Sequence, residues 1–89
     1  METLEFLNSR NARILLYIYE NGGEVIGFRD LSIKMRMGYH TLKDGLRDLR
    51  YFDLLTKEVG PNNVSIYRLT DKGKKAAELL KQLIDVLEE

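Results

Sequence analysis

The sequence predicts a small α+β protein that is mostly helical. Apolar residues recur at helical spacing in four stretches of the chain. Between the third and the fourth stretch, apolar and polar residues alternate from Leu55 to Leu69 around a Gly-Pro-Asn-Asn sequence. This alternation is typical of a two-stranded hairpin. The 89 residues are enough for one small domain with a modest core.

The first predicted helix runs from about Arg10 to Asn21. Ser9, or Asn8 before it, is a suitable N-cap, and a pair of glycines follows the helix. Apolar residues lie on two of its sides, with Ala12, Leu15, Leu16 and Tyr19 on one and Ile14, Tyr17 and Ile18 on the other. A helix that is apolar on two sides needs a neighbour on each. We expect the extra neighbour to be another subunit.

A short β-branched segment and a second helix come next. Residues 24–26 fit a small strand that pairs with the later hairpin. Residues 28–35 predict a helix that ends near Gly38, and its expected core residues are Phe28, Leu31, Ile33 and Met35. The order is therefore helix, short turn, helix.

The third predicted helix, Gly38 to Phe52, has two unlike faces. Leu42, Leu46 and Leu49 follow a helical stripe that faces the core. The opposite side carries His40, Lys43, Asp44, Arg47 and Tyr51. A short helix with an apolar back and a front rich in donors is suited to reading the major groove of DNA.

The last predicted helix runs from Asp71 to about Glu88, with Thr70 as its N-cap. Its broad apolar surface consists of Leu79, Leu80, Leu83, Ile84, Val86 and Leu87. A small domain without a disulfide or metal is often stabilised by oligomerisation. We therefore expect a homodimer through this surface, with help from the first helix and from residues 1–7. Residues 1–70 would form the DNA-binding part and residues 71–89 the dimerisation helix of a single structural domain.

Charge is distributed unevenly along the chain. The net charge is zero, yet residues 34–75 hold ten cations and five acids, giving +5, and the flanks carry −5. This pattern suggests that one face meets an anionic partner, although plain solubility is an alternative explanation. The chain has no cysteine, no signal peptide and no apolar run of membrane-spanning length. We expect a cytoplasmic, nucleoid-associated protein without a membrane partner.

The sequence contains no arrangement of residues typical of an enzyme or a metal site. His40 is the only histidine, so we expect neither a metal nor another cofactor. The serines fit a helix cap, a helix surface and a strand, and no phosphate-binding loop is present. Tyr17, Tyr19 and Tyr67 could line a ligand pocket between subunits, but core packing explains them more simply. A small-molecule effector is possible but unsupported.

Two motifs carry a resemblance to a known group of proteins. They are Leu42-x-x-x-Leu46-x-x-Leu49-x-x-x-x-Leu54-Leu55 and Tyr67-Arg68-Leu69-Thr70-Asp71-Lys72-Gly73. Residues 9–83 resemble the MarR, PadR and ArsR type of small transcription regulators and their archaeal relatives. The resemblance implies a winged helix-turn-helix fold: a three-helix core, a β-hairpin wing and a C-terminal dimerisation helix. Asp53 replaces the usual glycine of the group, and Asp tolerates the left-handed backbone better than most residues.

The resemblance also implies how the protein binds double-stranded DNA. The third helix enters the major groove, and the hairpin tip reaches the backbone or the minor groove. Expected contacts from this helix are Tyr39, His40, Thr41, Lys43, Asp44 and Arg47. Expected contacts from the wing and to the backbone are Arg36, Lys57, Asn62, Asn63 and Arg68. Asp44 and Asp48 on the groove-facing side predict modest non-specific affinity.

The expected function is sequence-specific DNA binding by a homodimer that regulates transcription, most simply as a repressor by occlusion. Two alternatives remain open at this point. One is an architectural chromatin protein without sequence preference, and the other is a winged helix that contacts proteins.

Overall fold

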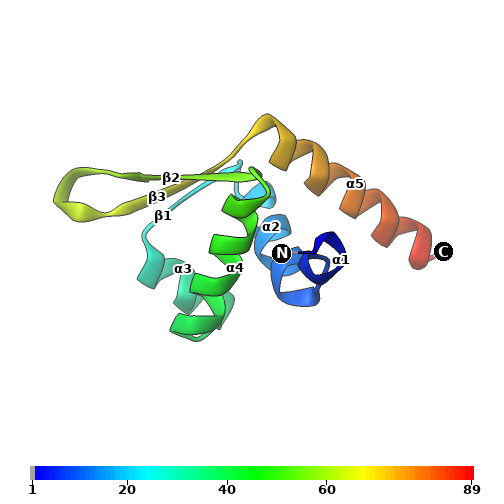
Figure 1. Ribbon diagram of the computed structural model, residues 1–89, viewed down its shortest axis with the longest axis horizontal. Coiled ribbons are helices and arrows are strands. Elements are labelled where there is room, and N and C mark those ends of the chain that lie inside the picture. The colour runs from blue at the N-terminus through cyan, green and yellow to red at the C-terminus, as the bar shows by residue number, and fades with distance from the viewer. Residues whose placement is uncertain (1) are drawn as a thin grey trace.

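Figure 1 shows the arrangement of residues 2–89, the part of the chain that this computed structural model describes. The helices α2, α3 and α4 lie together, the β2–β3 hairpin extends from one side, and α5 runs out on the other. In chain order the elements are α1 (Thr3–Phe6), α2 (Ser9–Glu20), β1 (Glu24–Ile26), α3 (Phe28–Met35), α4 (Tyr39–Tyr51), β2 (Leu55–Val59), the 3-10 turn η1 (Pro61–Asn63), β3 (Ser65–Leu69) and α5 (Asp71–Leu87). No helix within residues 2–89 combines the length and the apolar character that crossing a membrane requires.

The sheet joins the short β1 strand to the hairpin. Its strand order is β1-β3-β2, and both pairings are antiparallel. Tyr67 in the central strand lies opposite Val25 on one side and Lys57 on the other. Since successive side chains alternate between faces, these three residues share one face of the sheet. Tyr67 is buried, so this face packs on the helices, and the predicted pairing of residues 24–26 is confirmed.

The leucine stripe of α4 forms the centre of the core, as predicted. Leu42 and Leu49 are fully buried, and Leu46 is nearly so. In α2 the most buried positions are Asn11, Ile14, Leu15 and Ile18. They include residues from both predicted apolar sides of the helix, because α2 packs against α4 on one side and α5 on the other.

Two features of the N-terminal half differ from the predictions. Ile33 is 65% exposed, so its predicted place in the core is wrong. Leu31 and Met35 are one helical turn apart and point inward, which turns the residue midway between them outward. The structure also contains α1, whose Phe6 ring packs on Phe52 with a centroid distance of 4.7 Å. Met1, which we included in the dimer prediction, lies outside the described residues.

The prediction that Asp48 faces a groove is wrong. Asp48 is 5% exposed, and its Oδ2 accepts from Arg10 Nη2 at 2.5 Å and from Asn11 Nδ2 at 3.1 Å. Asn11 also donates to the Phe6 carbonyl at 2.9 Å. Asp48 is covered because α2 comes very close to α4 at Gly45, where an added Cβ would lie 2.2 Å from Ile14 Cδ1. The carboxylate therefore joins α4 to α2, and Asn11 extends the connection to α1.

The junction from α4 through the hairpin to α5 follows the predicted chemistry. Asp53 has a φ of 62°, the left-handed conformation expected at this position. Thr70 caps α5 by accepting from the Gly73 amide at 2.9 Å, and its hydroxyl donates to the Asp53 carbonyl at 2.7 Å. The cap of α5 is thus joined directly to the turn that ends α4.

Candidate nucleic-acid interface

The exposed side of α4 carries the predicted polar residues. Gly38 precedes the helix in extended conformation, and the buried leucine stripe fixes which side faces outward. The exposed residues on this side include Tyr39, His40, Thr41, Lys43, Arg47 and Arg50. Because the leucine stripe is held by the core, the helix presents these side chains on a rigid support.

A hollow of about 370 Å³ lies between α4 and the wing. It is lined by Phe28, Tyr39, Lys43, Leu46, Arg47, Arg50, Lys57, Ser65 and Tyr67. Four of these residues are cations, and none of the described residues that line the hollow is acidic. The arrangement places four positive charges around one concave surface, which is the electrostatic footprint of a site for an anionic backbone.

Aromatic contacts hold one end of this hollow. The Tyr39 ring meets Phe28 edge-on with a centroid distance of 5.1 Å and meets His40 at 5.2 Å. The Lys43 ammonium lies 5.7 Å from the centre of the Tyr39 ring. Phe28 packs against the core, so Tyr39 and Lys43 are positioned by a chain of contacts that begins there.

Arg47 is paired within its own helix. Its Nη2 lies 3.1 Å from Asp44 Oδ1, one turn earlier. Both side chains are accessible, with 68% of Arg47 and 43% of Asp44 exposed. Arg47 follows Asp44 at a spacing of three residues, which brings the two side chains together on the helix surface.

The tip of the wing is an exposed turn. Asn62 and Asn63 both have positive φ, at 60° and 59°, a conformation that Asn adopts more readily than most residues. The Gly60 amide donates to the Val64 carbonyl at 2.7 Å and closes the turn. The two asparagine side chains therefore stand at the end of the hairpin.

Arg68 lies on the other face of the sheet. It is adjacent in β3 to Tyr67, which faces the helices, so Arg68 points away from them. Its guanidinium contacts Glu24 at 2.5 Å and Glu58 at 2.6 Å, and these hydrogen bonds raise the pKa of Arg68 above its usual value. This double pairing joins the three strands and does not favour Arg68 as a phosphate contact.

Arg36 is also outside the hollow between α4 and the wing. It ends α3 in the left-handed conformation, with a φ of 54°. Its side chain lines a separate, open depression between α2 and α3, together with Arg13 and Lys34. Lys57 is thus the only one of the predicted wing and backbone contacts, within residues 2–89, that the structure brings beside Lys43 and Arg47.

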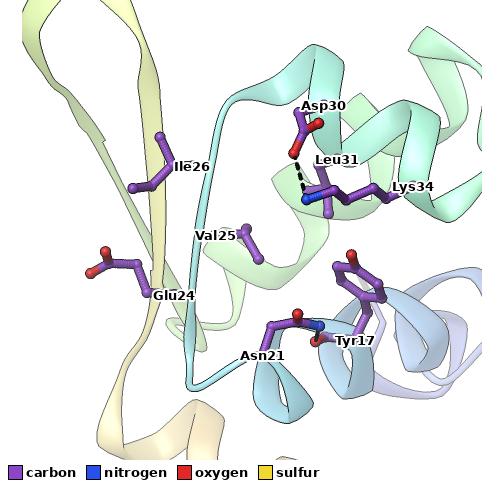
Figure 2. Close-up of a pocket in the computed structure, with 8 residues that line it drawn as sticks. All are labelled: Tyr17, Asn21, Glu24, Val25, Ile26, Asp30, Leu31 and Lys34. Atoms are coloured by element: carbon purple, nitrogen blue, oxygen red, sulfur yellow. Dashed lines mark hydrogen bonds and ion pairs between the residues drawn. The ribbon is translucent and has the colours of Figure 1, made fainter.

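Figure 2 shows another hollow, of about 330 Å³, where α2, β1 and α3 meet. Asp30 and Lys34 form an ion pair of 3.0 Å across one side of it, and this contact raises the pKa of Lys34. Glu24, its remaining charged residue, pairs with Arg68. Each charged group that lines this hollow has a partner, so a small-molecule effector gains no support from it. Residues 2–89 also hold no cluster of three side chains that could bind a metal ion.

Sequence reasoning did not identify Arg50 as part of the interface. Arg50 follows Lys43 and Arg47 at spacings of seven and three residues, so helical periodicity places it on the same side. That spacing could have indicated it. Ser65 and Tyr67 could not have been found in this way, because only the pairing of the strands brings them to α4.

Several solved structures share this architecture. The crystal structure of MepR, a transcription regulator of the Staphylococcus aureus multidrug efflux pump MepA, matches with a TM-score of 0.80 at 21% identity over 91% of this chain and 60% of MepR. The chain has a winged helix-turn-helix fold. The S. aureus MepR–DNA complex matches with a TM-score of 0.79 at 20% identity, over 92% of this chain and 60% of that one. AF1382 from Archaeoglobus fulgidus matches with a TM-score of 0.79 at 25% identity over 99% of both chains.

These matches confirm the predicted fold class and the resemblance to winged-helix transcription regulators at the level of the fold. No protein-family model and no curated protein matches the sequence. The winged-helix chain spans about 60% of the length of MepR. In winged-helix terms, α3 and α4 form the helix-turn-helix, and β2 and β3 form the wing.

Proposed function

We propose that this winged-helix protein binds double-stranded DNA at specific sequences as a homodimer and regulates transcription. Repression by occlusion of a promoter is the simplest form of such regulation. The observation that carries the proposal is the hollow between α4 and the wing, with four cations and no acid among its described lining residues. MepR, whose fold this chain shares, is a transcription regulator and has been crystallised with DNA.

Two kinds of DNA contact are expected from this surface. Lys43 and Arg47 would reach base edges or phosphates from α4, and Tyr39, His40 and Thr41 would meet the backbone at its N-terminus. Lys57, Asn62 and Asn63 would contact the backbone or minor groove from the wing, and Arg50 joins the proposed phosphate contacts. Three phosphate contacts from Lys43, Arg50 and Lys57 give a slope of log K against log salt of about −2.7 per protomer, and a fourth from Arg47 would make it about −3.6.

The homodimer is supported by apolar surface at the C-terminal end. The start of α5 packs on the core through Ala77. The rest of the helix leaves Leu79, Leu83, Val86 and Leu87 between 53% and 73% exposed. An apolar hollow of about 310 Å³ lies between α5 and the N-terminal helices, with Phe6, Leu15 and Leu80 in its lining. Exposed apolar surface of this kind is typical of an interface.

In this proposal, residues 71–89 form the dimerisation helix and residues 1–70 the DNA-binding part. The interface would consist of Leu79, Leu80, Leu83, Ile84, Val86 and Leu87, with help from α1 and α2. A two-fold dimer binds a pseudo-palindromic site whose half-sites lie one helical turn apart, roughly 34 Å.

A mobility-shift assay with genomic fragments tests the proposal against its two alternatives. Sequence-specific binding gives discrete shifted fragments that survive competition by unrelated DNA. An architectural chromatin protein retards every fragment equally. A winged helix that contacts only proteins shifts none of them.

A further inference from the structure

Arg47 differs from the other cations of the hollow between α4 and the wing. Its guanidinium is held by Asp44, with 3.1 Å between Arg47 Nη2 and Asp44 Oδ1. Within residues 2–89, Arg50 and Lys57 have no carboxylate partner, and Lys43 lies over the Tyr39 ring. The hollow thus combines three cations without an ion pair and one whose charge is partly neutralised.

We propose that Asp44 is a specificity-determining residue that positions Arg47 for the edge of a guanine and disfavours contact with phosphate. The inference rests on the proposed DNA binding and adds a role within it. Lys43, Arg50 and Lys57 supply contacts that are independent of sequence, while the Asp44–Arg47 pair reads a base.

The donor geometry of Arg47 permits it to pair with Asp44 and with a guanine at the same time. A guanidinium carries five N–H donors in a planar fork, and Asp44 occupies a donor on Nη2. The remaining donors include a pair that can reach guanine O6 and N7 together. Holding the long side chain in advance lowers the cost in conformational entropy on binding. The paired arginine is therefore better prepared for a base edge than a free one.

The charge of Asp44 also acts against the competing contact. A phosphate that approaches Arg47 brings a full negative charge close to the exposed carboxylate, whereas guanine presents neutral acceptors. Two unit charges 4 Å apart in water interact by about 1 kcal/mol, which corresponds to roughly a fivefold change in affinity. The repulsion therefore weakens contact between Arg47 and phosphate but not contact with guanine. This raises the ratio of the affinities for cognate and non-cognate DNA.

A plain helix-stabilising role for this pair predicts something different. An exposed pair three residues apart contributes little to folding, and losing it would leave DNA discrimination unchanged. The ratio of affinities for a cognate and a non-cognate duplex distinguishes the helix-stabilising role from the role in specificity. This ratio does not respond to a small change in folding stability.

The test uses Asp44→Asn in the full chain, with a duplex selected from genomic fragments and a shuffled duplex of equal length and composition. We expect affinity for the shuffled duplex to rise about fivefold for each protomer that contacts it, while affinity for the selected duplex stays level or falls. The matched control is Asp85→Asn, which changes the charge equally on an exposed part of α5. It should leave the ratio of the two affinities at the wild-type value.

The same substitution in an Arg47→Ala background tests whether Asp44 acts through Arg47. We expect the ratio of affinities to be the same in Arg47→Ala and in the double variant. If Asp44→Asn leaves the ratio of the two affinities unchanged, for example by raising both equally, this inference is overturned while DNA binding stands. If the wild-type chain binds neither duplex, the proposed function fails, and the role of Asp44 fails with it.

Discussion

Gly73 lies where α5 comes close to the backbone of Leu54, between α4 and β2. A Cβ at this position would stand 2.0 Å from the Leu54 carbonyl oxygen. That oxygen is backbone and also accepts from the Thr70 amide at 3.0 Å, so it cannot move aside without breaking the cap region. The glycine in the Tyr67 to Gly73 motif is therefore required by packing.

Gly73→Ala should lower the free energy of unfolding, although Ala favours helix by about 1 kcal/mol over Gly. The steric clash typically costs about 1–3 kcal/mol when the neighbour cannot give way. Urea denaturation measures the change in midpoint. Lys75→Ala on an exposed position of the same helix is the control, and we expect it to stay within about 0.5 kcal/mol of wild type. Equal midpoints for Gly73→Ala and the control would contradict this packing account.

Asp48 is the buried polar group that joins the N-terminal helices to α4. Asp48→Ala leaves Arg10 and Asn11 without their shared acceptor, and removing hydrogen bonds to a charged group costs about 1.5–3 kcal/mol. Asp44→Ala is a matched control, because it removes an exposed carboxylate from the same helix and should cost less than about 1 kcal/mol. Denaturant unfolding of both variants checks this. A smaller loss of stability for Asp48→Ala than for Asp44→Ala would be inconsistent with the observed burial.

The helices α2 and α5 are linked through Tyr19. Its hydroxyl donates to Glu78 at 3.2 Å, and the Lys81 ammonium lies 5.8 Å from its ring centre. Partial burial and then the charge of Glu78 raise the pKa of Tyr19 above its usual 10.0. The folded protein therefore holds this proton at a pH where the unfolded chain has begun to release it.

This shift predicts a loss of stability as pH rises. Below pH 10 both states carry the proton and the full contribution is present; above it the unfolded state binds fewer protons, so unfolding becomes easier. We expect Tyr19→Phe to show a shallower decline of the urea midpoint between about pH 9 and pH 11 than wild type. The other groups that titrate there are common to both proteins. Parallel declines would exclude a contribution from Tyr19.

The elements differ in how well the sequence predicted them. Local signals placed α4, its leucine stripe, the hairpin, the Asp53 turn and the Thr70 cap, because each depends on neighbours in the chain. The positions of Asp48 and Arg68 depend on contacts between distant elements. Asp48 is covered by α2, and Arg68 is turned away by strand alternation and paired across the sheet. The prediction grouped Asp48 with Asp44 on the groove-facing side, whereas the contact with α2 buries it.

In the candidate site, too, the features that depend on neighbours in the chain were predicted and those that depend on distant contacts were not. Periodicity placed Lys43, Asp44 and Arg47 on the exposed side of α4, where the structure shows Asp44 paired with Arg47. The hollow itself was not predictable, because it forms only where the wing returns to α4 and brings Lys57 beside Arg50. Arg36 was predicted as a backbone contact, and its side chain lines a different depression, between α2 and α3.

The exposed apolar end of α5 indicates that the whole protein assembles as a homodimer. Leu83→Asp places a charge on the proposed interface and should convert a dimer to a monomer in light scattering while circular dichroism keeps its helical signal. Lys74→Asp is the control, since nine residues of helix put it on the opposite side of α5. A wild-type monomer, or a dimer of Leu83→Asp, would be contrary to the proposed role of α5.

We propose that the protein binds DNA through the face formed by α4 and the wing. The most direct measurement is the affinity for a selected duplex at several salt concentrations, in wild type and in Lys57→Ala. We expect a clearly negative slope of log K against log salt in wild type. We expect a slope shallower by about 1.8 in Lys57→Ala, because a homodimer of the variant neutralises two phosphates fewer, one in each protomer. A wild-type slope near zero would mean that no counterions are released, and would contradict the account.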